Sequence, residues 1–139
     1  MEYLNTQPFE HQLEILEKIK SLDNYAIFWE MGTGKTRLMI DYVRYLSYEK
    51  HRPIKVLIIC PKIAIYNWLN EFRKFSKLEQ YVEILQGTKE DRINKLISYV
   101  KTIFIVNFEG ARILEDTLNK IIFDLIIVDE SQKIKNYKA

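Results

Sequence analysis

The residues best suited to chemistry form a short glycine-containing stretch near the start of the chain. Residues 28–36 read FWEMGTGKT, in which Gly32 and Gly34 precede Lys35 and Thr36. Glycine lets backbone N–H groups come close to phosphate oxygens, and a helix starting near Lys35 would add the positive end of its dipole. Lys35 would contact the β- and γ-phosphates of a nucleotide, and the Thr36 hydroxyl would coordinate Mg²⁺. The stretch therefore predicts a phosphate-binding loop.

This loop departs from the full phosphate-loop pattern at one position. The pattern G-x-x-x-x-G-K-[ST] has glycine where Trp29 stands. A glycine-bearing turn before a helix, with no ligand, therefore stays open as an explanation of this motif taken alone.

A second group of candidate residues ends an apolar run. The stretch DLIIVDE, residues 124–130, reads as a buried strand that ends in Asp129 and Glu130. Asp129 would hold Mg²⁺ through water, and Glu130 would polarise the attacking water. Two solvated carboxylates at a strand end are the alternative. The two motifs together, in this order, indicate ATP-dependent phosphoryl transfer.

These motifs lie on an alternation of short apolar runs and amphipathic stretches. Nearly unbroken apolar runs predict strands at 26–29, 55–60, 81–85, 102–106 and 123–129. Helical spacing of apolar residues predicts helices over 8–21, 39–46, 65–75, 93–100 and 111–118. The rhythm predicts an α/β domain with a mainly parallel sheet. Ligands of such sheets bind beyond the carboxyl ends of the strands, which is where both motifs fall.

Composition limits the class of protein. A chain of 139 residues fits one domain, and 47% hydrophobic with 29% charged residues is typical of a soluble globular protein. No apolar run approaches the roughly 20 residues of a membrane span. The single cysteine, Cys60, excludes an internal disulfide and suits a reducing, cytoplasmic setting, while His11 and His51 make a weak case for a metal site.

Charge is distributed unevenly although the net charge is only +2. Acidic residues predominate over 1–30 and basic residues over 44–77. A basic segment of this kind is compatible with a surface that faces nucleic acid. A solvated helix face explains the same charges equally well.

The motifs resemble those of the Swi/Snf-type ATPases, which are related to superfamily-two helicases. The stretch DESQKIKN, residues 129–136, resembles the family's Asp-Glu-x-Gln motif, and EMGTGKT resembles its first motif, which tolerates a non-glycine residue where Trp29 stands. The stretch PFEHQLEIL, residues 8–16, is similar to the family's opening motif, in which a glutamine reads adenine. This similarity gives that role to Gln12.

The resemblance implies a set of nucleotide-site residues. Those expected to bind ATP are Gln12, Met31, Gly32, Thr33, Gly34, Lys35 and Thr36. The catalytic group is expected to be Lys35, Asp129 and Glu130, with Thr36 and Asp129 holding Mg²⁺ and Gln132 coupling nucleotide state to motion.

Two further stretches resemble segments that contact the phosphate backbone of one DNA strand in the family. They are residues 57–72, LIICPKIAIYNWLNEF, and residues 105–112, IVNFEGAR. The candidate DNA contacts are Pro61, Lys62 and Asn107. Ordinary structural roles stay open: Lys62 as an exposed lysine, Cys60 as a small buried residue, and a helical row of core aromatics made of Trp68, Phe72 and Phe75.

The family's motor consists of two RecA-like lobes. The resemblance implies that residues 1–139 are a partial first lobe, a three-layer domain whose sheet is incomplete at the C-terminal end, and that the second lobe is absent. That lobe supplies an arginine finger worth about 10³–10⁵ in rate, so we expect the chain to bind Mg–ATP but to hydrolyse it poorly.

The parent protein is expected to couple ATP hydrolysis to translocation on double-stranded DNA, with a protein or nucleoprotein complex as a further partner. The alternative is a non-catalytic module that binds nucleotide, DNA or protein. The Lys-, Ile- and Asn-rich composition suggests a cytoplasmic protein of bacterial or phage source.

Overall fold

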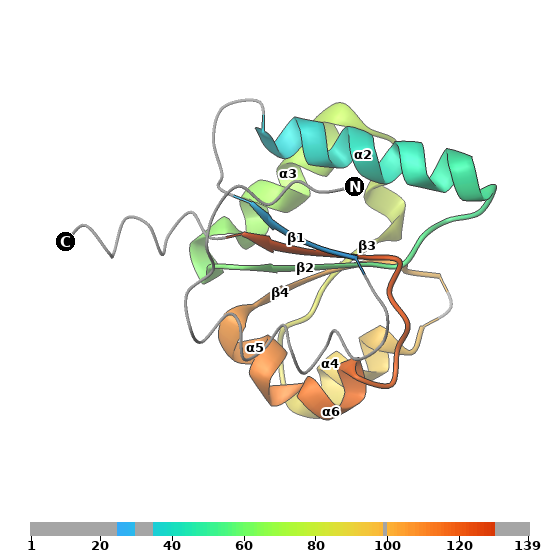
Figure 1. Ribbon diagram of the computed structural model, residues 1–139. Coiled ribbons are helices and arrows are strands. Elements are labelled where there is room, and N and C mark those ends of the chain that lie inside the picture. The colour runs from blue at the N-terminus through green and yellow to red at the C-terminus, as the bar shows by residue number, and fades with distance from the viewer. Residues whose placement is uncertain (1–24, 30–34, 99, 130–139) are drawn as a thin grey trace.

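The chain folds as alternating strands and helices in the computed structural model, which describes residues 25–29, 35–98 and 100–129 (Figure 1). The strands are β1 (Tyr25–Trp29), β2 (Val56–Cys60), β3 (Val82–Ile84), β4 (Ile103–Asn107) and β5 (Leu125–Asp129). The α-helices are α2 (Lys35–Lys50), α3 (Ile65–Phe75), α4 (Lys89–Leu96), α5 (Phe108–Ile113) and α6 (Glu115–Leu118). Among the described residues the order also includes two 3-10 helices, η2 (Lys62–Ala64) and η3 (Glu79–Tyr81).

All five strands form one sheet in the order β1-β5-β2-β4-β3, and every neighbouring pair is parallel. Parallel neighbours need crossover connections, and the helices supply them. The predicted α/β class with a mainly parallel sheet is confirmed. The five predicted strands are also confirmed, with ends that differ by one or two residues.

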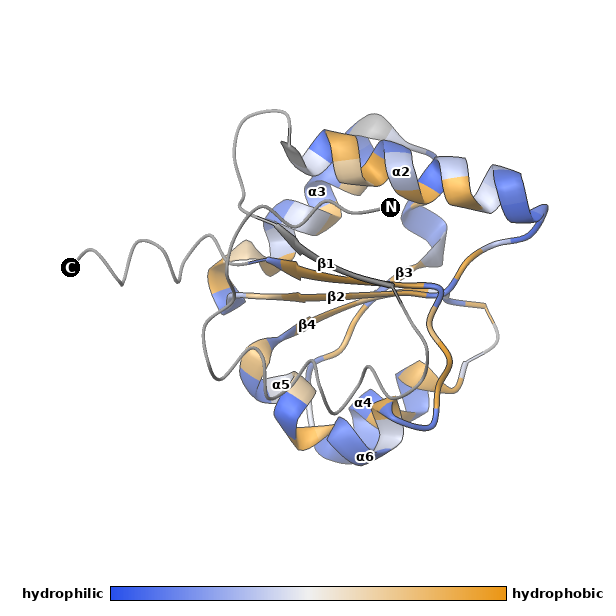
Figure 2. Cartoon of the chain, in the orientation of Figure 1, coloured by the Kyte–Doolittle hydropathy of each residue, from blue (hydrophilic) through white to orange (hydrophobic). Residues whose placement is uncertain are grey.

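Strands β2 and β5 lie inside the sheet and are buried along their whole length. Successive side chains of a strand point to opposite faces, so Val56 and Ile58 join one apolar cluster while Leu57 and Ile59 join another. Both faces must therefore be covered, which explains why these strands are uninterrupted apolar runs. Figure 2 shows that the strands inside the sheet are apolar, whereas the helices carry both polar and apolar residues.

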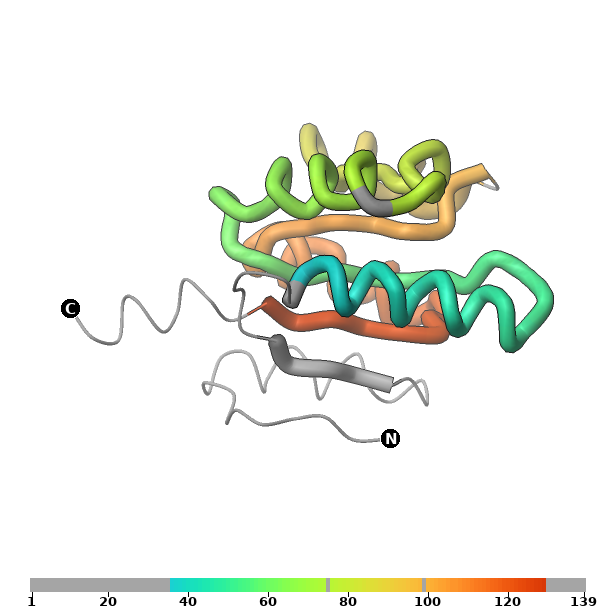
Figure 3. The backbone as a smooth tube through the Cα atoms, turned by 90° about the horizontal axis from the view of Figure 1, so that it is seen from above, coloured from blue at the N-terminus to red at the C-terminus, as the bar shows by residue number. Residues whose placement is uncertain are grey.

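Helices cover the two faces as separate layers. Helices α2 and α3 lie on one face, and α4, α5 and α6 lie on the other (Figure 1). Seen from above, α2 and α3 run side by side over the sheet (Figure 3). Met39 and Val43 of α2 and Trp68 and Phe72 of α3 pack into the same cluster as Ile127 of β5. The expected three-layer arrangement is thus present.

One predicted helix ends earlier than its apolar spacing suggested. The pattern predicted a helix over 93–100, but α4 ends at Leu96, and Ile97 and Val100 are 61% and 65% exposed. Its start is fixed by reciprocal hydrogen bonds between Thr88 and Asp91. The chain has to turn back after Leu96 because β4 begins only a few residues later at Ile103.

Two other predictions meet the structure differently. The predicted helix over 111–118 is divided into α5 and α6, while Ala111, Leu114 and Leu118 are buried as expected. The predicted helix over 8–21 lies outside the described residues. Within the part of the chain that the structure describes, no helix combines the length and apolar character needed to cross a membrane.

Candidate nucleotide site at the carboxyl edge of the sheet

The carboxyl ends of four neighbouring strands bring the candidate residues to one edge. Trp29, the last residue of β1, is paired with Asp129, the last residue of β5. On the other side of β5, Cys60 at the end of β2 is paired with Asn107 at the end of β4. The strand ends that directly precede or include parts of the phosphate-loop motif, the acidic motif and both DNA-contact segments therefore lie along this single edge.

Helix α2 begins on the same side as the acidic residue. It starts at Lys35, at the same end of the sheet as the carboxyl ends of the strands (Figure 1). Thr36 is only 4% exposed, and Met39 one turn later packs in the cluster that contains Ile127. Asp129 lies two residues after Ile127 in β5 and so points to the same face. Thr36 and Asp129 thus belong to the layer between α2 and the sheet.

These two residues suit a hard cation. Magnesium prefers oxygen ligands and is usually held by one or two protein groups together with substrate phosphates. The Thr36 hydroxyl and the Asp129 carboxylate, which is 0% exposed, are the buried polar side chains among the described residues. No group of three or more His, Cys, Asp or Glu side chains gathers as a metal cage within the described ranges. The donor set therefore fits Mg²⁺ delivered with a nucleotide.

Asp129 receives a hydrogen bond that the sequence motifs did not reveal. The indole Nε1 of Trp68 donates to Asp129 Oδ2 at 3.0 Å, and both side chains are 0% exposed. Trp68 is therefore a core residue, as its helical spacing indicated, but it also contacts the carboxylate of the acidic motif. The signal that could have pointed to it is chemical, because a buried indole N–H needs an acceptor.

Cys60 lies beside the same carboxylate. Burial, and then the negative charge of Asp129, raise the pKa of the Cys60 thiol well above its ordinary value. The thiol is therefore neutral at physiological pH and poorly nucleophilic. This agrees with its predicted role as a small buried residue.

The three candidate DNA contacts differ in exposure. Lys62 is exposed at the start of η2, Asn107 is half-buried, and Pro61 is buried. The ring of Pro61 therefore offers little surface to a large ligand. The Asn107 side chain caps α5, since its Oδ1 accepts a hydrogen bond from the Gly110 N–H at 2.7 Å. This cap uses the amide oxygen of Asn107 rather than its nitrogen.

The start of α5 is packed tightly against the end of β4. A Cβ added to Gly110 would come within 2.5 Å of an Arg92 nitrogen and 2.8 Å of Asn107 Oδ1. A side chain there would displace the cap that orients Asn107. Glycine in the NFEG stretch thus has a steric explanation.

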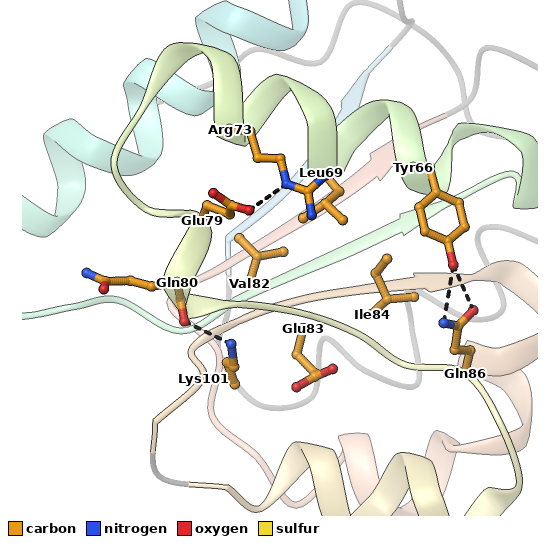
Figure 4. Close-up of a pocket in the computed structure, with 10 residues that line it drawn as sticks. All are labelled: Tyr66, Leu69, Arg73, Glu79, Gln80, Val82, Glu83, Ile84, Gln86 and Lys101. Atoms are coloured by element: carbon orange, nitrogen blue, oxygen red, sulfur yellow. Dashed lines mark hydrogen bonds and ion pairs between the residues drawn. The ribbon is translucent and has the colours of Figure 1, made fainter.

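A hollow of about 530 Å³ lies elsewhere, along the outer edge strand β3 (Figure 4). Its polar groups contact one another: Arg73 pairs with Glu79, Tyr66 exchanges hydrogen bonds with Gln86, and Lys101 donates to the Gln80 carbonyl. Strands β4 and β2 separate β3 from β5. This hollow is therefore not part of the nucleotide site.

Several predicted residues lie outside the described part of the chain. They are Gln12, Met31, Gly32, Thr33, Gly34, Glu130 and Gln132. The side chains of Lys35 and Phe75 are not described either. The roles given to these residues stay predictions.

Comparison with known proteins confirms the resemblance found in the motifs. Residues 11–139 match the family described as SNF2-related domain. The yeast Saccharomyces cerevisiae protein named ISWI chromatin-remodeling complex ATPase ISW1 is 33% identical over 145 residues, covering 99% of this chain and 13% of that protein. The Schizosaccharomyces pombe ATP-dependent helicase fft1 is 35% identical over 113 residues, covering 77% of this chain and 12% of its own length.

A relative named for DNA repair is also similar. Mouse DNA excision repair protein ERCC-6 is 28% identical over 125 residues, which covers 79% of this chain and 8% of that protein. The chain therefore spans only between 8% and 13% of these three relatives.

The expected location and source are wrong. The relatives are proteins of yeasts, plants and mouse, several of them named for remodelling chromatin, which is a nuclear substrate. This contradicts a cytoplasmic protein of bacterial or phage origin. Lys-, Ile- and Asn-rich composition reflects coding bias as much as cell type, and one buried cysteine fits any reducing compartment.

Proposed function

The chain belongs to the SNF2-related domain family, and we propose that it is the ATP-binding part of a DNA-dependent ATPase. One observation carries this proposal. Thr36, which follows the lysine of the phosphate-loop motif at the start of α2, and Asp129 of the acidic motif at the end of β5 are both buried. These two residues, from motifs almost a hundred residues apart in the sequence, both lie at the end of the sheet where parallel sheets bind ligands.

Each residue has a distinct task in the proposed site. Lys35 contacts the β- and γ-phosphates, and Thr36 and Asp129 hold Mg²⁺. When bound, the metal would offset the negative charge of the nucleotide phosphates. Glu130 orients the attacking water, and Gln132 passes nucleotide state to the rest of the motor. Gln12 reads the adenine edge.

We propose that residues 1–139 form part of the first of two RecA-like lobes and hydrolyse ATP slowly by themselves. In-line phosphoryl transfer depends on positioned charges, and the family places the arginine finger on the second lobe. That finger contributes about 10³–10⁵ in rate. Binding of Mg–ATP needs only the groups of the first lobe and does not depend on it.

The proposed macromolecular partner is double-stranded DNA, along which the parent protein would move. Two relatives are named as a chromatin-remodeling ATPase and a DNA excision repair protein, which supports DNA or a nucleoprotein complex as the object of the motor. Asn107 is the last residue of β4, and Lys62 follows the end of the neighbouring strand β2. Both therefore lie at the carboxyl edge of the sheet, where the nucleotide site is proposed. Contacts from these residues to the DNA backbone would place DNA next to the ATP site.

Isothermal titration calorimetry of Mg–ATP against the chain tests the nucleotide site. Lys35→Ala should weaken binding about 10- to 100-fold, because a charge-assisted contact to phosphate is lost. Lys50→Ala is the matched control, since Lys50 is an exposed lysine at the opposite end of the same helix. It should bind like the unsubstituted chain.

GTP serves as the second comparison in the same titration. Adenine-selective binding that Lys35→Ala loses would support the proposal. Equal affinity of Lys35→Ala and Lys50→Ala would refute the phosphate-loop assignment. DNA binding without any nucleotide binding would favour the non-catalytic module instead.

A further inference from the structure

A buried hydrogen bond joins helix α3 to the acidic end of β5. Trp68 Nε1 donates to Asp129 Oδ2 at 3.0 Å, and neither side chain is exposed to solvent. The two residues are 61 positions apart in the sequence. Their contact therefore exists only once the α3 layer has packed on the sheet.

The chemistry of this contact suits a carboxylate that has to bind a cation. A hydrogen bond to an ionised acceptor is shorter and stronger than one between neutral groups. The indole is a neutral donor, so it orients the carboxylate without cancelling the negative charge that attracts a metal.

Trp68 is itself held rigidly. Its ring packs against Phe72 one turn later, with centroids 6.5 Å apart and planes tilted by 36°. Both rings lie in the cluster that includes Met39 of α2 and Ile127 of β5. Because protein cores are close-packed, the indole cannot turn without opening this cluster, and the direction of its N–H is fixed.

The geometry points to Trp68 as a positioning residue for Asp129: its indole N–H holds the carboxylate in the orientation that receives Mg²⁺ at the phosphate loop. This inference rests on the proposed function, which places Mg²⁺ on Asp129. Trp68 does not touch the nucleotide or the metal in this account. It acts through the carboxylate that it contacts.

The gain in ATP affinity on adding Mg²⁺ is the quantity that Trp68 should control. We would measure the dissociation constant of ATP in EDTA and in excess Mg²⁺, and divide the first by the second. Trp68→Phe keeps an aromatic ring but removes the donor, so this ratio should fall about 10- to 100-fold, the usual cost of losing a residue that orients a metal ligand. ATP affinity in EDTA should stay the same.

Phe72→Leu is the matched control. Phe72 is equally buried on the same helix and packs on the same ring, but it gives no hydrogen bond to Asp129. It should lower the melting temperature and leave the Mg²⁺-dependent gain intact. If Trp68→Phe and Phe72→Leu both keep the full gain, Trp68 is only a packing residue and the inference is overturned.

A measurement on the unsubstituted chain covers the case in which Trp68→Phe does not fold. The indole Nε1–H of Trp68 gives its own NMR signal, which Trp29→Phe separates from that of the other tryptophan. This signal should shift when Mg–ATP is added and stay in place when ATP is added in EDTA. If the chemical shift of the Trp68 indole N–H does not change at saturating Mg–ATP, the inference is overturned.

Lys35→Ala separates this inference from the proposed function. If Lys35→Ala leaves ATP binding unchanged, the proposed site is wrong and the role of Trp68 falls with it. If Lys35→Ala weakens binding while Trp68→Phe keeps the Mg²⁺-dependent gain, the site stands and only the role of Trp68 is refuted.

Discussion

Two aspartates at opposite ends of strand β5 have opposite surroundings. Asp124 directly precedes the strand and Asp129 is its last residue. Both are carboxylates beside the same buried apolar run, and both accept hydrogen bonds from segments far away in the sequence. They differ in the donors that surround them and in how much solvent reaches them.

At the amino end, Asp124 is neutralised by a cation. Both of its oxygens accept hydrogen bonds from Arg52, at 2.9 and 3.0 Å, and Oδ2 also accepts the Lys55 N–H at 2.8 Å. Burial opposes ionisation of Asp124, but the bonds from Arg52 and Lys55 outweigh it and lower the pKa. These contacts occupy the Asp124 carboxylate and fix the segment between α2 and β2 to the start of β5.

At the carboxyl end, Asp129 is completely buried and accepts a hydrogen bond from the neutral indole of Trp68. This donor carries no charge, unlike the Arg52 guanidinium beside Asp124. The same residue type thus serves stability at one end of the strand and, in our proposal, metal binding at the other. The two ends of the sheet should therefore respond differently to the same substitution.

Removing the amino-end carboxylate should have the largest effect on stability. Asp124→Ala leaves the Lys55 N–H without its acceptor and Arg52 without its partner, so unfolding free energy should fall by about 1–3 kcal/mol. Most of this loss should come from the hydrogen bond of the Lys55 backbone N–H, because Arg52 is exposed and solvent screens its ion pair with Asp124. Urea denaturation measures the change.

Arg52→Ala is the comparison for that experiment. It should cost clearly less than Asp124→Ala, since the Lys55 bond survives. Equal losses in the two variants would mean that the ion pair, not the backbone bond, fixes the start of β5.

Acid should remove the contribution of Asp124 with a predictable sign. The folded-state pKa is lowered below its ordinary value, so the stabilisation is complete above about pH 4 and disappears as pH falls through the folded pKa. The stability difference between the unsubstituted chain and Asp124→Asn should therefore shrink toward acid pH. A difference that stays constant from neutral to acid pH would contradict this.

The smallest effect is expected from a single lysine at the carboxyl edge. Lys62→Ala should weaken binding to double-stranded DNA and reduce the slope of log affinity against log salt by about one, as expected for one phosphate contact. Lys55→Ala is the control, because Lys55 directly precedes β2 at the opposite edge, whereas Lys62 follows it. Equal losses of DNA affinity in Lys62→Ala and Lys55→Ala would mean that DNA does not bind at the carboxyl edge in particular.

The sequence predicts the strands well because β2 and β5 are unbroken apolar runs, which suit parallel strands covered on both faces. It does not predict their order, because spatial neighbours depend on crossovers rather than on local pattern. It also extends α4 too far, since Ile97 and Val100 keep helical spacing after the helix has ended.

The site was predictable to a similar extent. Because ligands of parallel sheets bind at the carboxyl edge, the order of the motifs along the chain is enough to predict that Thr36 and Asp129 lie at one edge. Helical spacing described Trp68 only as a core residue, because nothing local to α3 shows an acceptor 61 residues away. Asn107 caps α5 through a residue only three positions away, Gly110. The Asn and Gly at this spacing were the only sign of the cap in the sequence.

The most direct test compares Mg–ATP affinity in Asp129→Asn and Asp124→Asn by calorimetry. Each substitution removes one charge at one end of β5 and keeps the shape of the side chain. Our account predicts that Asp129→Asn loses the Mg²⁺-dependent gain in ATP affinity while Asp124→Asn retains it and loses only stability. If Asp129→Asn binds Mg–ATP as tightly as the unsubstituted chain, Asp129 is not the metal-binding carboxylate and the central claim fails.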